Sequence, residues 1–90
     1  MKSYEMLIGG AFVAAASGAT FETENPFTGA AWARIPRAGK EDVDRAVKAA
    51  ADAFRAPSWS AISASQRGAL IRRFADLLAA NADRLAEIET

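Results

Sequence analysis

"SGATFETENPFTGAAWARIPRAG", residues 17–39, decides how the first third of the chain folds. Within residues 20–24, a phenylalanine and a threonine alternate with two glutamates, which is the period of two typical of a half-exposed strand. Residues 31–35 are the expected partner strand. Between the two runs, Pro26 fixes φ for a turn and Gly29 can adopt the left-handed conformation that closes a hairpin. The stretch therefore predicts a β-hairpin.

A second, smaller hairpin is predicted upstream of this stretch. Residues 6–8 and 11–13 are short apolar runs, and only Gly9 and Gly10 separate them. A glycine pair tolerates the positive φ that a tight two-residue turn requires. The first third of the chain is therefore expected to hold two hairpins joined by a loop.

Downstream of the strands, the hydrophobic period becomes that of an α-helix. This helix is expected to begin at Lys40 and to end before Pro57, which cannot continue it. Glu41 and Asp42 occupy its first turn, where the helix dipole favours acidic side chains. The apolar residues at helical spacing are Val43, Ala46, Val47, Ala50 and Phe54. The expected i,i+4 ion pairs on its exposed side are Glu41 with Arg45 and Asp44 with Lys48.

The last third of the chain carries the strongest apolar stripe. Ser63 and Gln66 form a capping-box pattern that predicts a helix start. The stripe that follows consists of Leu70, Ile71, Phe74, Leu77 and Leu78. Asn81 then allows two interpretations, because Leu85 and Ile88 continue a heptad rhythm. One long helix with a polar intrusion is possible, but we favour a break and a further helix.

A core is expected to use nearly all the large apolar side chains. The chain has 90 residues, of which 51% are hydrophobic, and alanine supplies much of that share. A chain this short buries only about 60–65% of its unfolded surface. We therefore expect truncation of Phe74 to alanine to leave a cavity and to destabilise the fold.

Composition excludes several functional classes. Eleven basic and eleven acidic residues give zero net charge, which argues against nucleic acid and anionic membranes as partners. The absence of cysteine and histidine removes thiolate nucleophiles, the commonest general base and the commonest zinc ligands. The apolar start contains a glutamate and two glycines, so we expect no secretory signal. The chain has no apolar run long enough for a membrane span. We therefore expect a cytoplasmic location.

Two clusters of charged side chains are candidate sites. Arg67, Arg72 and Arg73 could meet phosphates, but no aromatic residue interleaves with them, so a solvated helix face is expected. Glu22 and Glu24 share one strand face and could serve acid–base chemistry or bind a cation. No third ligand accompanies them. We therefore interpret these glutamates as an exposed face.

The remaining motifs are interpreted as structural. Gly9-Gly10 and "TGAAWA", residues 28–33, match neither the dinucleotide fingerprint nor the Walker spacing. Trp32 and Trp59 are expected to serve a core or an interface rather than a ligand. The sequence thus predicts no catalytic, cofactor-binding or metal-binding residue in these 90 residues.

Together, the order and spacing of the motifs resemble the N-terminus of the NAD(P)-dependent aldehyde dehydrogenase superfamily. The resemblance covers nearly the whole chain. The motifs that carry it are the glycine hairpin "LIGGAFV", S-G-x-T-F, N-P-x-T-G, "EDVDRAV", "RGALIRRFADLL" and the ending L-A-x-x-E-T. The chain departs from the family pattern at Ala11 and Ala30, where charged residues are common, and both changes concern surface charge.

The resemblance implies an α+β fold. Two short hairpins followed by two or three amphipathic helices would form a peripheral part of the cofactor-binding domain. Residues 1–90 would then be one partial domain, with a hairpin region at 1–39 and a helical region at 40–90. In some relatives, oxygens matching Thr23 and Glu24 help to hold a monovalent cation, but the later acidic partner lies outside this sequence.

The resemblance also implies the activity of a longer parent enzyme. That enzyme would oxidise an aldehyde to a carboxylic acid with NAD or NADP, through a cysteine nucleophile and a glutamate base that lie beyond these residues. The 90 residues would be inactive scaffold, partnered by the remainder of a homo-oligomeric parent. The alternative is a stand-alone module that self-associates through its helix stripes.

Overall fold

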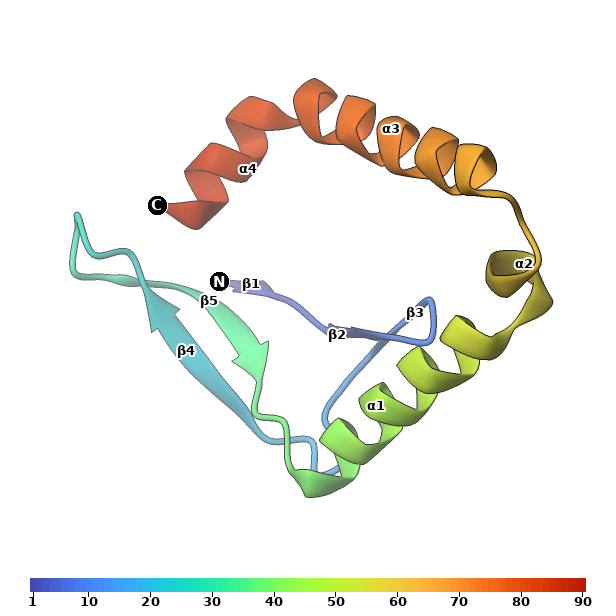
Figure 1. Ribbon diagram of the computed structural model, residues 1–90. Helices are drawn as coiled ribbons and strands as arrows, with labels where there is room; N and C mark the ends of the chain where they lie inside the picture. Colours follow the sequence, from blue (N-terminus) through green and yellow to red (C-terminus); the bar gives the residue numbers. More distant parts are fainter. The chain divides into compact units, whose positions relative to one another are not determined.

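A computed structural model describes all residues 1–90, which form two compact units, Met1–Ala53 and Phe54–Thr90. The fold is α+β, as predicted: strands come first and helices follow (Figure 1). The strands are β1 (Lys2–Ser3), β2 (Met6–Ile8), β3 (Ala11–Val13), β4 (Thr20–Glu24) and β5 (Ala31–Pro36). The helices are α1 (Lys40–Arg55), α2 (Pro57–Ser60), α3 (Ala64–Ala80) and α4 (Ala82–Glu89). The boundary between the two units falls inside α1.

The β4–β5 hairpin confirms the first sequence prediction. The strands are antiparallel, with Glu22 opposite Arg34, and the register shifts between Thr23 and Glu24. In the turn, the Asn25 carbonyl accepts a hydrogen bond from the Gly29 amide at 2.7 Å, and the Asn25 side chain accepts one from the Phe27 amide at 2.9 Å. The Asn-Pro-x-Thr-Gly sequence therefore closes the hairpin through local hydrogen bonds.

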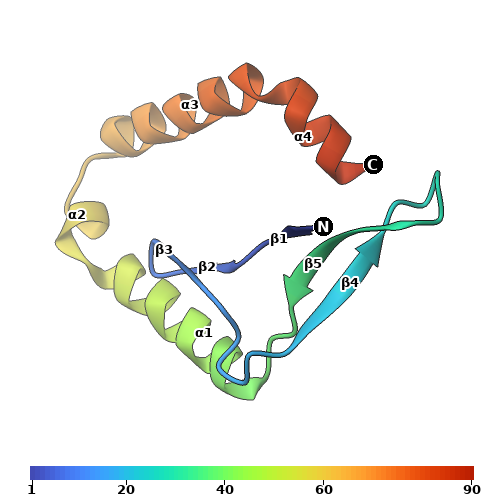
Figure 2. The ribbon, with the colours of Figure 1, turned by 180° about the vertical axis from the view of Figure 1, so that it is seen from behind.

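The upstream hairpin is also confirmed, and one strand was missed. β2 and β3 pair antiparallel around Gly9 and Gly10, whose φ angles are 61° and 79°. The unpredicted strand β1 pairs in parallel with β5, which gives a three-stranded sheet of order β1-β5-β4 (Figure 2). A two-residue strand shows no periodicity, so the sequence pattern could not reveal it.

Gly29 offers a test of the hairpin turn. Its φ is 71°, where a side chain is strained, so Gly29→Ala is expected to destabilise the protein by about 1 kcal/mol. Gly68 is the matched control: it lies inside α3 with open space around it, and Gly68→Ala is expected to stabilise by about 0.5 kcal/mol. Urea unfolding of both variants measures the difference. Equal effects at the two sites would contradict the turn geometry.

The ion pairs on α1 differ from those predicted. Asp44 and Lys48 were predicted to pair with each other, but Asp44 pairs with Lys40 at 3.0 Å and Lys48 pairs with Asp52 at 2.7 Å. The Arg45 guanidinium pairs with Asp42 at 2.6 Å instead of Glu41. Asp42 is buried, and a buried carboxylate attracts a cation more strongly than an exposed one does.

The helix boundaries in the last third follow the sequence signals. Ser63 and Gln66 form the predicted capping box, with their reciprocal hydrogen bonds at 3.1 and 2.8 Å. The favoured break at Asn81 is also present: α3 ends there, and the Asn81 side chain donates to the Leu77 carbonyl at 2.9 Å. The short helix α2 was not predicted, because four residues are too few to show a helical period.

Removal of the cap at Ser63 is expected to shorten α3. Ser63→Ala leaves the Gln66 amide without its side-chain acceptor, which costs about 1 kcal/mol of helix stability. Ser65→Ala is the control, since Ser65 is an exposed residue of the same helix that takes no part in the cap. Circular dichroism during thermal unfolding measures both variants. Equal melting curves for the two would argue against the capping box.

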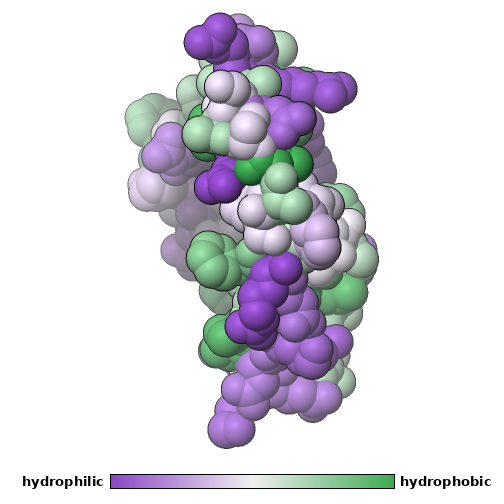
Figure 3. Space-filling view, turned by 45° about the vertical axis from the view of Figure 1, so that its right-hand side comes forward, coloured by the Kyte–Doolittle hydropathy of each residue, from purple (hydrophilic) through white to green (hydrophobic).

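The expectation of a core built from large apolar side chains is wrong for this structure. The buried hydrophobic residues are only Ala15 and Ala33, and Phe74 is 62% exposed. Figure 3 shows hydrophobic side chains at the surface between hydrophilic ones. Phe74→Ala would therefore leave no cavity here, and the predicted loss of stability does not follow. An apolar stripe in the sequence identifies one face of a helix, but it does not show whether another part of the chain packs against that face.

Candidate functional site

Asp42 is the only buried charged residue, and it joins two distant parts of the first unit. Its side chain is 3% exposed. One carboxylate oxygen accepts hydrogen bonds from the Ala16 amide at 2.9 Å and from the Arg45 guanidinium at 2.6 Å. The other accepts one from the Gly39 amide at 2.9 Å. Asp42 thus ties the loop before β4 to the start of α1; we call this set of contacts the Asp42 clamp.

The hydrogen bonds of the Asp42 clamp keep its carboxylate ionised. The Gly39 amide contributes most to lowering the pKa of Asp42 below its ordinary value of 3.8, followed by the Ala16 amide and the Arg45 side chain. Burial opposes this shift but does not overcome it. A general base that works near neutral pH needs a raised pKa, so this carboxylate suits a structural role rather than proton transfer.

The two strand glutamates lie on an exposed face, as interpreted from the sequence. Glu22 is about half exposed and lies 3.7 Å from Arg34 on the neighbouring strand. Across the chain, no three acidic, histidine or cysteine side chains come together in a way that could hold a metal ion. The geometry gives Glu22 a cross-strand ion pair, which is worth little at an exposed site.

The structure separates the three arginines of the candidate basic cluster. Arg67 is half-buried, with its guanidinium 5.8 Å from the centre of the Trp59 ring and a 3.2 Å hydrogen bond to the Ile62 carbonyl. Arg72 and Arg73 are exposed on α3. The other tryptophan, Trp32, packs edge-on against Tyr4 with ring centres 6.0 Å apart. Arg67 therefore links the start of α3 to the residues that precede it, Trp59 and Ile62. Both tryptophans have partners within the chain.

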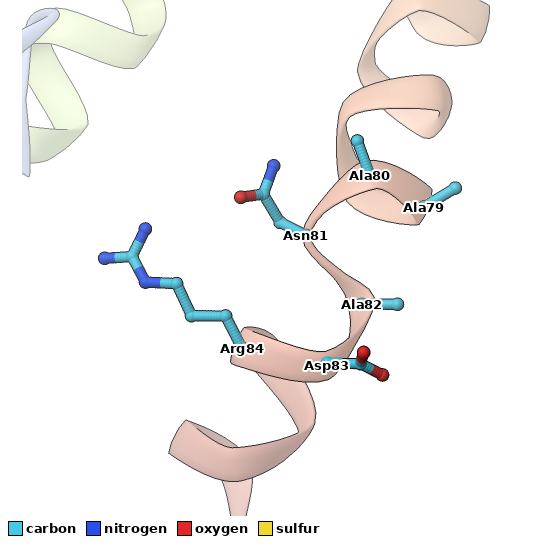
Figure 4. Close-up of a pocket in the computed structure, with 6 residues that line it drawn as sticks. All are labelled: Ala79, Ala80, Asn81, Ala82, Asp83 and Arg84. Atoms are coloured by element: carbon cyan, nitrogen blue, oxygen red, sulfur yellow. The ribbon is translucent and has the colours of Figure 1, made fainter.

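Each of the two units has a hollow on its surface. The first lies against α1 and has a volume of about 330 Å³; its lining residues are Leu7, Ile8, Gly9, Gly10, Ala46, Ala49, Ala50 and Ala53. The second, of about 320 Å³, lies at the junction of α3 and α4, where Asn81 and Arg84 extend to one side and Asp83 to the other (Figure 4). Neither is formed by a glycine-rich loop leading into a helix, so the residues present do not fit NAD.

The largest unexplained feature of the second unit is its apolar surface. No residue of Phe54–Thr90 is buried. The large side chains that remain exposed on the two last helices are Leu70, Ile71, Phe74, Leu77, Leu78, Leu85 and Ile88, and we call them the α3–α4 apolar face. No helix of the protein has both the length and the apolar character needed to cross a membrane. Extended apolar patches of this kind mark interaction surfaces.

Comparison with known proteins identifies the family. The pattern of the aldehyde dehydrogenase family matches residues 12–90. A curated relative, the (Z)-2-((N-methylformamido)methylene)-5-hydroxybutyrolactone dehydrogenase of Acinetobacter baylyi, is 46% identical over the whole chain, which spans 18% of that relative's length.

Solved structures agree in sequence and fold. The NAD-dependent aldehyde dehydrogenase of Sinorhizobium meliloti is 40% identical with a TM-score of 0.90, and the NAD+ complex of a Bacillus cereus aldehyde dehydrogenase is 41% identical with a TM-score of 0.93. They match 99% and 98% of this chain, which covers 18% of each of them. The match extends from the glycine hairpin through the last helix, so the chain is an N-terminal segment and belongs to the aldehyde dehydrogenase family.

Proposed function

We propose that residues 1–90 are the N-terminal scaffold of an NAD-dependent enzyme that oxidises an aldehyde to a carboxylic acid. The observation that carries this proposal is the match to NAD-dependent and NAD+-bound aldehyde dehydrogenases over almost the whole chain. In such a reaction NAD+ accepts a hydride from the substrate. The specific aldehyde depends on segments outside these residues.

The catalytic and cofactor-binding groups are proposed to lie outside residues 1–90. Two features of the chain support this. Cysteine and histidine are absent, so the segment supplies no thiolate nucleophile and no imidazole base. Its one buried carboxylate, Asp42, is held as an anion by two backbone amides and an arginine. This carboxylate is therefore proposed to serve the structure and not to transfer protons.

The contribution of this segment is proposed to be structural. The exposed apolar side chains of α1 and α3, for example Val47 and Phe74, would contact the remainder of the longer polypeptide. Burial of such side chains contributes about 25 cal/mol per Å² of apolar surface removed from water. The segment would thus stabilise the body of the enzyme without touching the substrate.

The test compares two polypeptides. A longer polypeptide that contains residues 1–90 and extends to the length of the relatives is expected to form NADH from NAD+ with at least one aldehyde in a chemically diverse panel. The polypeptide of residues 1–90 is expected to form none under the same conditions. Turnover by the short polypeptide, with contaminating enzyme excluded, would overturn the scaffold role. A folded longer polypeptide that oxidises no aldehyde with NAD+ would overturn the proposed activity.

A further inference from the structure

We draw no further inference here: the strongest candidate, the apolar face of α3 and α4 around Phe74, belongs to the surface already proposed to contact the remainder of the longer polypeptide, and nothing in the structure shows which part of that polypeptide covers it.

Discussion

Replacement of Asp42 by alanine is expected to release the loop before β4 from α1. The change removes the acceptor for two backbone amides, Ala16 and Gly39, and leaves the Arg45 guanidinium without its partner. The two amide hydrogen bonds are part-buried, and both lose their acceptor in a single substitution. We expect the midpoint of thermal unfolding of the first unit to fall by about 10 °C.

Hydrogen exchange locates this effect within the unit. The amides of Ala16 and Gly39 are expected to lose protection by at least about tenfold in the Asp42→Ala protein. Asp44→Ala is the matched control, because Asp44 lies half a turn further along the same helix and makes only an exposed pair with Lys40. If the two variants lower protection equally, the clamp does not hold the loop.

Acidification is expected to weaken the Asp42 clamp in the same place. The pKa of Asp42 in the folded protein lies below its ordinary value of 3.8, so the unfolded chain takes up the proton first as the pH falls. The stability that Asp42 contributes is therefore fully present above its ordinary pKa. It is lost as the pH falls through the lower pKa of the folded protein.

Unfolding measured from about pH 6 to about pH 2 tests this dependence. Other carboxylates titrate in the same range, so the informative quantity is the difference between the parent protein and Asp42→Asn. The asparagine variant has nearly the same shape but no charge to lose, and its stability at neutral pH should already be reduced. The difference between the two proteins should shrink towards zero in acid. A constant difference across the range would show that Asp42 is not the group responsible.

Local sequence rules predicted much of this fold. The turn before Gly29 and the cap at Ser63 depend on hydrogen bonds between residues two to four positions apart, so residue type and spacing are sufficient to recognise them. The break at Asn81 was favoured over one continuous helix although residue spacing left both open, and in the structure the Asn81 side chain bonds to the carbonyl of the preceding turn.

The features that escaped prediction depend on residues far apart in the chain. The pairing of β1 with β5 joins Lys2 to Ala33, and the Asp42 clamp joins residues 26 positions apart. The sequence placed Asp42 correctly in the first turn of its helix but could not show what its carboxylate faces. The apolar stripe of α3 was also recognised, but the expectation that it is buried was wrong, because periodicity describes one surface and says nothing of the surface opposite.

The Asp42 clamp has a practical consequence for the hairpin it encloses. The hydrogen bond between Ala16 and Asp42 closes the intervening chain into a loop with its ends fixed, and the tip at Phe27, 90% exposed, lies near the middle of that loop. Loop-closure entropy rises slowly with length. An epitope tag or a fluorescent label grafted at this tip should therefore be displayed to solvent while the anchor keeps its geometry, which antibody capture and exchange at Ala16 would verify.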